Sequence, residues 1–288
     1  MANTREIKLR IKGVNQTKKI TKAMKMMAAV KLRKARERHN ATKPYFNYIQ
    51  ETMTDILKRL PNMDTVYFDN RENKKNRKIG YIVIASDRGL TGSYNHNVIK
   101  LAKKLIDKES GIVFPIGKMV KNILSKENYT INTELEDIDY NIDMYTARII
   151  ANKMIAFYKD GVIDELKLVY TDMKSAMSLK PNTISILPLD KKQFEQGAVR
   201  ANEELQLEPS PEVVFDELAS KYTKGIIYGG MVEAFASEQL ARMNAMDNAT
   251  TNAENLVKKL TLDFNRARQA SITQEISEII GGTMNMND

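Results

Sequence analysis

The C-terminal part of the chain carries one long helical pattern. Residues 231–280 contain neither Gly nor Pro, so the fifty residues can form a single helix about 75 Å long. Apolar residues recur there every three or four positions, which is the spacing of one helical face. They are Met243, Met246, Ala249, Ala253, Leu256, Leu260, Phe264 and Ala267. An apolar stripe of this length needs a partner.

The N-terminal forty-odd residues repeat the same spacing and can supply that partner. Their apolar positions are Ile7, Ile11, Val14, Ile20, Met24 and Met27. We expect a helix that begins at Asn3 or Thr4 and runs to Pro44. An apolar pattern continues from Tyr48 to Leu60, so Pro44 either kinks the helix or ends it. The two terminal helices are predicted to wind on each other.

The middle of the chain changes to alternating strands and helices. Short apolar runs predict strands at residues 80–85, 111–116, 165–171 and 182–187, and helical patterns cover residues 98–106, 118–125 and 143–158. This alternation predicts a compact α/β insert with a parallel or mixed sheet. Gly225, Gly229 and Gly230 interrupt the pattern before Met231, where we expect the long helix to start. The predicted domains are residues 1–60, 75–208 and 209–288.

Charge is concentrated at one end of the chain. Residues 1–43 hold fourteen Lys or Arg against two Glu, whereas the whole chain carries +9, so the remaining residues sum to −3. The basic helix is therefore a specific feature. It is either a solvated face, a surface for nucleic acid, or a surface for an acidic protein. No Phe, Tyr or Trp for base stacking occurs in residues 1–43, but the last two interpretations stay open.

Candidate catalytic chemistry is sparse. The chain has no Cys, which excludes disulfides and thiolate nucleophiles, and His39 and His96 lie in unrelated segments. Residues 111–119 imitate a phosphate-binding loop, but five residues separate the glycines and Met119 stands where Ser or Thr is required, so a strand and turn are favoured. We expect no cofactor and no metal. No apolar run approaches the roughly 20 residues of a membrane span, and the first residues resemble neither a signal nor a transit peptide.

Two further features admit alternatives. Residues 86–92 follow the first predicted strand, where open α/β sheets bind ligands, so Asp87 and Arg88 either hold a small anion or partner or belong to a simple turn. Methionines cluster on both terminal helices and either fill the seam between them or face outward against a changing partner surface. They are Met24, Met26, Met27, Met231, Met243 and Met246.

Three segments in order along the chain resemble the γ subunits of F-type ATP synthases. Residues 18–34 resemble the N-terminal signature, residues 86–92 with Asn95 resemble the central motif, and residues 237–246 and 265–282 resemble the C-terminal signature. The resemblance implies a bowed antiparallel coiled coil of the terminal helices and a Rossmann-like, mostly parallel α/β domain. It departs from the family's pattern at Thr91, where many relatives have Cys, and at Leu207, where an aromatic residue is common.

The resemblance also implies a function and partners. The chain would be the rotating central shaft, in single copy, inside a hexamer of three α and three β subunits. Its α/β domain would contact the ε subunit and the c-ring, whose proton-driven rotation it would transmit to the β catalytic sites. It would have no catalytic site of its own and would lie at the cytoplasmic face of a bacterial plasma membrane, peripherally. The rival hypothesis is a basic coiled-coil protein that binds nucleic acid.

Site residues follow from the resemblance by position. Those implied to contact the β subunit are Met24, Lys25, Arg266, Arg268, Gln269, Thr273 and Glu275. Those implied to contact ε or the c-ring are Asp87, Arg88 and Glu208. Arg266, Gln269 and Thr273 are three and four residues apart and therefore share one helical face, while Arg268 and Glu275 share a neighbouring face.

Overall fold

The computed structural model describes residues 4–68, 77–135, 142–173, 178–194 and 207–284. The chain divides into two compact units, one made of residues 1–28 and 242–288 and the other of residues 29–241. Two helices, α1 (Thr4–Arg59) and α5 (Pro211–Met284), each contribute residues to both units.

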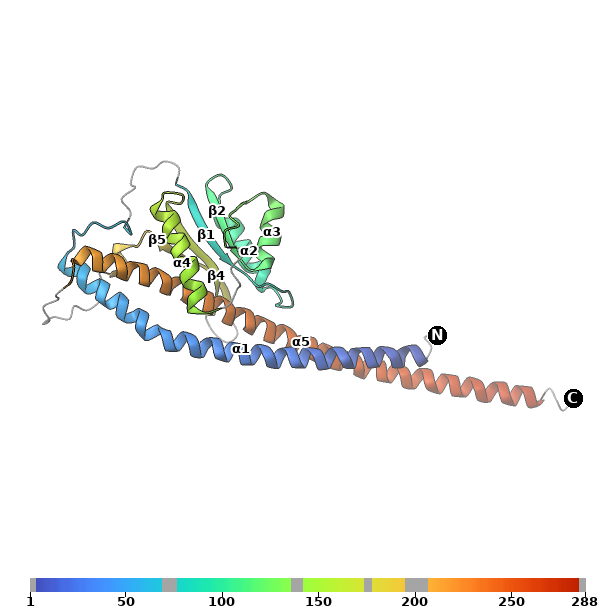
Figure 1. The fold of residues 1–288 in the computed structure, drawn as a ribbon. Coiled ribbons are helices and arrows are strands. Elements are labelled where there is room, and N and C mark those ends of the chain that lie inside the picture. Colours follow the sequence, from blue (N-terminus) through green and yellow to red (C-terminus); the bar gives the residue numbers. More distant parts are fainter. Residues whose placement is uncertain (1–3, 69–76, 136–141, 174–177, 195–206, 285–288) are drawn as a thin grey trace. The chain divides into compact units, whose positions relative to one another are not determined.

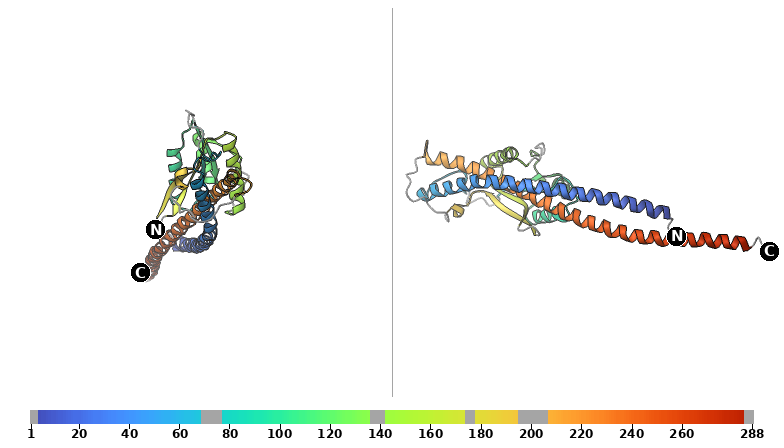
Figure 2. Two further views of the ribbon diagram at one scale, coloured as in Figure 1. Left: turned by 90° about the vertical axis from the view of Figure 1, so that its left-hand side faces the viewer. Right: turned by 90° about the horizontal axis from the view of Figure 1, so that it is seen from below.

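The first unit is a two-helix coil of the start of α1 and the end of α5, which lie side by side (Figures 1 and 2). Direct contacts join Lys18 to Glu254, Thr21 to Thr250 and Lys25 to Asp247. The residue numbers rise on one helix as they fall on the other, so the two helices are antiparallel. The predicted antiparallel pairing of the terminal helices is confirmed.

The seam of this coil follows a seven-residue repeat on both helices. Its buried and half-buried positions are spaced alternately by four and three residues. On α1 they are Ile7, Ile11, Val14, Lys18, Thr21, Lys25 and Ala28, and on α5 they are Met246, Thr250, Ala253, Val257, Leu260, Phe264 and Ala267. The prediction was wrong at Ile20, Met27 and Leu256, which are 60%, 57% and 38% exposed, because the seam passes through the next residue in each case, Thr21, Ala28 and Val257.

The second unit contains a five-stranded sheet in the order β3-β2-β1-β4-β5. Strands β1 (Ile79–Ile84), β2 (Gly111–Ile116), β3 (Thr130–Ile131) and β4 (Glu165–Met173) pair in parallel, while β5 (Leu179–Leu187) runs antiparallel to β4. The predicted mostly parallel sheet is confirmed. Sequence analysis missed β3, because two residues are too short to give a periodic signal.

Helices pack against this sheet through apolar residues. Helices α2 (Tyr94–Leu105) and α3 (Lys118–Leu124) share a buried cluster with β1 and β2, which includes Tyr81, Val83, Val98 and Leu124. Helix α4 (Met144–Lys159) stacks its Phe157 ring on Phe114 of β2, with ring centroids 5.6 Å apart. Short 3-10 turns occupy Ser125–Glu127 and Lys191–Phe194. Buried apolar faces of strands and helices therefore account for the α/β core.

The two terminal helices compare differently with the patterns. Helix α1 passes through Pro44 to Arg59, which agrees with the alternative in which Pro44 does not end it, whereas α5 starts at Pro211, twenty residues before the expected Met231. Gly225 and Gly230 lie inside α5 because neighbours approach them closely. A Cβ atom at Gly225 would lie 2.2 Å from the Phe46 ring, and one at Gly230 would lie 2.2 Å from Leu168 Cδ2. These glycines permit close packing instead of marking a joint.

Candidate functional site

The loop after β1 is held by its own polar side chains. The backbone N–H of Ser86 donates to Asn95 Oδ1 at 3.0 Å, and Ser86 Oγ donates to the carbonyl of Arg88 at 2.6 Å. Asn95 Nδ2 donates to Thr91 Oγ1 at 3.2 Å. Ser86, Thr91 and Asn95 are all buried. These three residues of the central motif therefore shape the loop from inside.

The two candidate residues of this loop differ in their surroundings. The Asp87 carboxylate accepts a hydrogen bond from the backbone N–H of Lys118 at 3.0 Å, in the first turn of α3. The side chain of Arg88 is exposed. Gly117, which precedes α3, has φ +98°, and a Cβ there would lie 2.1 Å from the carbonyl oxygen of Ala85. The first amide of α3 is thus taken by Asp87, so the turn after β2 is not an open phosphate cradle.

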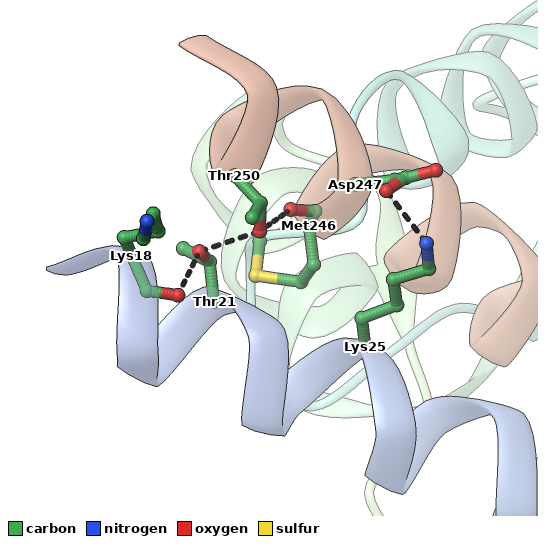
Figure 3. Close-up of polar contacts among 6 residues, drawn as sticks. All are labelled: Lys18, Thr21, Lys25, Met246, Asp247 and Thr250. Carbon is green, nitrogen blue, oxygen red and sulfur yellow. Dashed lines mark hydrogen bonds and ion pairs between the residues drawn. The ribbon is translucent and has the colours of Figure 1, made fainter. Parts of the chain in front are cut away.

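A polar cluster joins the two helices of the first unit (Figure 3). Lys25 Nζ lies 2.6 Å from Asp247 Oδ1, and Lys18 Nζ lies 3.7 Å from Glu254 Oε1. Between these ion pairs, the hydroxyl oxygens of Thr21 and Thr250 are 2.7 Å apart. The ammonium of the candidate residue Lys25 therefore has an acidic partner within its own chain. Its neighbour Met24 is half-buried.

The far end of α5 runs past the start of α1. The contacts of the cluster place Thr4, the first described residue of α1, level with Ala267. Residues 268–280 of α5 are all exposed. Two local contacts involve the candidate residues here: Thr273 Oγ1 donates to the Gln269 carbonyl, and Ser271 Oγ donates to Glu275 Oε1.

Exposed apolar side chains lie on the same face of α5 as the candidates Arg266, Gln269 and Thr273. Leu262, Ile276 and Ile280 are 61%, 51% and 51% exposed. They extend a heptad stripe on α5 made of Leu262, Arg266, Gln269, Thr273, Ile276 and Ile280. Sequence analysis missed the three apolar members, although their spacing of three and four residues was visible. A stripe of this kind is suited to contact another protein.

Some of the methionines fill the interior and others are exposed, so each of the two alternatives holds for part of them. Met231 and Met246 are buried and fill the interior, whereas Met24 and Met243 are half-buried. Met26 and Met27 are 58% and 57% exposed on α1. Flexible thioether side chains in such positions adapt to changing surfaces.

Other polar groups of the second unit are engaged locally. A pocket is lined by Arg38, Ile142, Asp143, Met144 and Tyr228. In it Arg38 donates to the Ile142 carbonyl at 3.2 Å, and Asp143 accepts from the Thr146 N–H at 2.7 Å as the N-cap of α4. Burial raises the pKa of Tyr228, and burial together with Lys43 lowers the pKa of His39.

The candidate residue Glu208 is exposed and precedes α5 by three residues.

Among the described residues, no cluster of His, Asp or Glu has the makeup of a metal site. None of the helices in the described ranges combines the length and apolar character that crossing a bilayer requires.

Comparison with known proteins identifies relatives along nearly the whole chain. The family model described as "ATP synthase" matches residues 3–286. The ATP synthase gamma chain of Ruminiclostridium cellulolyticum is 44% identical, with 97% of each chain covered, and that of Caldicellulosiruptor saccharolyticus is 42% identical, with 98% of each covered.

Solved structures give the same fold. A chain from the central stalk and c-ring of the Tetrahymena thermophila mitochondrial ATP synthase is 25% identical with a TM-score of 0.57, covering 80% of this chain and 99% of that one. A chain from the Euglena gracilis mitochondrial ATP synthase has a TM-score of 0.66 at 18% identity, covering 98% and 94%. From the family model and the relatives at over 40% identity, the chain belongs to the family of ATP synthase gamma chains.

Proposed function

We propose that this chain is the rotating central shaft of a proton-translocating ATP synthase, present once within a ring of three α and three β subunits. The observation that carries the proposal is the full-length match to ATP synthase gamma chains. In this role the shaft transmits rotation of the c-ring to the β subunits. Because a single chain has no threefold symmetry, it contacts three identical β subunits differently and holds their catalytic sites in different conformations.

The end of α5 supports the proposed contact with the hexamer. Beyond Ala267, the described part of α1 no longer covers α5, and the helix exposes Ile272 and Ile276 there. Apolar side chains on a helix in water favour a partner that buries them. We assign Arg266, Arg268, Gln269, Thr273 and Glu275 to the β-facing surface on this basis and on the motif.

The basic start of α1 fits an acidic surface on the β subunit. Eight Lys or Arg lie between Thr4 and Ala28, against Glu6 alone. Lys18 and Lys25 already pair with acidic residues of α5, so the other cations contribute most to attraction of an outside partner. We therefore assign Met24 and Lys25 to the rim of the β contact. The nucleic-acid alternative has no support in the family or in the relatives.

The α/β unit is assigned to the foot of the shaft. We propose that Arg88 and the neighbouring Asp87 contact ε or the c-ring, together with Glu208. Arg88 and Glu208 have exposed side chains, and the related Tetrahymena chain comes from a structure of the central stalk and c-ring. The shaft itself carries out no chemistry, and the complex would hold it at the cytoplasmic face of a bacterial plasma membrane as a peripheral component.

The decisive experiment is assembly in solution. Tagged full-length chain is mixed with the α and β subunits, and the product is weighed by native mass spectrometry. We expect a species with three α, three β and one copy of this chain. A chain that stays alone, or that assembles with itself, would refute the shaft proposal. Binding of duplex DNA that persists at moderate salt would favour the nucleic-acid alternative instead.

A further inference from the structure

The seam between the two helices of the first unit becomes polar at three successive heptad positions. Lys18, Thr21 and Lys25 occupy sites that Ile7, Ile11 and Val14 fill nearer the start of α1. Thr21 is only 7% exposed, so its hydroxyl lies inside the interface. A polar residue at a seam position lowers the stability of a coiled coil but fixes its register.

The hydroxyl contacts in this layer form a directed chain. Thr21 and Thr250 possess two hydroxyl protons, whereas three contacts involve them (Figure 3). Thr250 Oγ1 lies 2.7 Å from the Met246 carbonyl and 2.7 Å from Thr21 Oγ1, and Thr21 Oγ1 lies 3.1 Å from the Lys18 carbonyl. The two shortest contacts use both protons if Thr21 donates to Thr250 and Thr250 donates to Met246. The interhelical bond then has one defined donor and one defined acceptor.

The apolar layers select this register only in part. In the observed pairing, residues of α1 and α5 that face each other in the seam have numbers that sum to about 271, as Thr21 and Thr250 do. A shift of one heptad would place Val14 beside Phe264 instead of Val257, which is still an apolar pair, but it would place Ile7 beside Ser271 instead of Phe264. The same shift would place the Thr21 hydroxyl beside Val257, so Thr21 would lose its interhelical partner and keep only the Lys18 carbonyl of its own helix as an acceptor.

One of the flanking ion pairs opposes the same shift. Lys25 contacts Asp247 and Lys18 contacts Glu254, on either side of the threonine pair. A one-heptad shift would bring Lys25 from Asp247 to Glu254, but it would leave Lys18 beside Thr261 without either carboxylate. The side chains of both pairs are 34–54% exposed, so each pair contributes little stability, and the pair of Lys18 with Glu254 mainly distinguishes one alignment from another.

We propose that Lys18, Thr21, Lys25, Asp247, Thr250 and Glu254 form a register pin, a polar cluster that fixes the alignment of α1 and α5 in this unit. This inference deepens the proposed function, since a shaft that transmits torque needs helices that do not slide along each other. Its residues are positioning residues, because they set where the exposed faces of both helices lie.

Disulfide trapping tests the pin in the full-length chain without partners. The chain has no Cys, so introduced pairs report register without background. Val14→Cys with Val257→Cys reports the observed register, and Val14→Cys with Phe264→Cys reports a shift of one heptad. We expect only the first pair to close in the otherwise unchanged chain. With Thr21→Val and Thr250→Val added, we expect closure of the shifted pair to rise about fivefold, as loss of one hydrogen bond implies.

A matched control separates register from stability. Thr17 and Thr261 donate to carbonyls of their own helices, so Thr17→Val with Thr261→Val removes two hydroxyls but no interhelical contact. This control should leave the trapping pattern unchanged. The double valine variant of the pin should keep or raise the melting temperature, because two apolar side chains of equal shape replace a polar layer.

A charge exchange gives a second test. Lys18→Glu alone should increase the shifted cross-link, because it repels Glu254 only in the observed register, and adding Glu254→Lys should reverse the increase. If the pin variants close only the observed pair, register is set elsewhere and the proposal is wrong. Because no other subunit is present, this failure is distinct from a failure of the chain to assemble with α and β.

Discussion

At the scale of single residues, neighbouring glycines of α5 have opposite roles. A Cβ at Gly230 would meet Leu168 at 2.2 Å, while Gly229 has no atom within 4 Å of that position. Gly229→Ala should raise the free energy of unfolding by about 0.5–1 kcal/mol through helix propensity. Gly230→Ala should lower it by about 1–3 kcal/mol through overpacking. Urea denaturation measures both, and equal shifts would contradict the close packing.

Asp87 and Arg88 form a second pair of neighbours with separable roles. Asp87 binds the Lys118 N–H, so Asp87→Ala should lower the free energy of unfolding by about 1 kcal/mol, as loss of a helix cap does. Arg88→Ala should change it by less than about 0.5 kcal/mol because the side chain is exposed. If the loop contacts ε, Arg88→Ala weakens ε binding in a titration while the melting curve stays the same. An equal loss of stability in both variants would remove this distinction.

At the scale of elements, the strands were easier to predict than the seam. Buried parallel strands are continuous apolar runs, so β2 was located to the residue and β1 to within one. The seam was predicted correctly where it is apolar, at Ile7, Ile11 and Val14. From Lys18 onward the prediction selected Ile20, whereas the residue in the seam is its neighbour Thr21. A hydrophobic pattern cannot identify seam positions where the interface is polar.

The exposed end of α5 gives a prediction for the element itself. Arg268→Ala with Gln269→Ala should leave the melting temperature of the isolated chain unchanged, because both side chains are exposed. In the assembled complex, the same variant should lower coupled ATP synthesis about tenfold if two anchoring contacts are lost. Rates of ATP synthesis in vesicles measure this, with Lys259→Ala as the exposed control on the same helix. Unchanged synthesis would show that the two side chains are dispensable.

At the scale of the whole molecule, interaction surfaces are harder to derive from sequence than folds. Burial and periodicity predicted the α/β unit and the paired helices from residue types alone. The sequence does not indicate that Asp87 binds the Lys118 N–H or that Lys25 pairs with Asp247, because the partners in both contacts are distant in sequence. The exposed stripe ending at Ile280 became recognisable once the register showed where α1 stops covering α5.

The uncovered end of α5 also predicts how stability is distributed along the chain. A helix of about 13 residues without packing is marginal in water, so amides in residues 268–280, which are all exposed, should exchange hydrogen fastest among the helical segments of the isolated chain. Amides near Ala253 and Leu260 should be protected, because these seam residues are only 8% exposed. Assembly with α and β should protect residues 268–280 selectively, since the hexamer would bury their apolar side chains. Hydrogen exchange measured by mass spectrometry, with and without α and β, tests this, and equal protection in both states would mean that the end of α5 needs no partner.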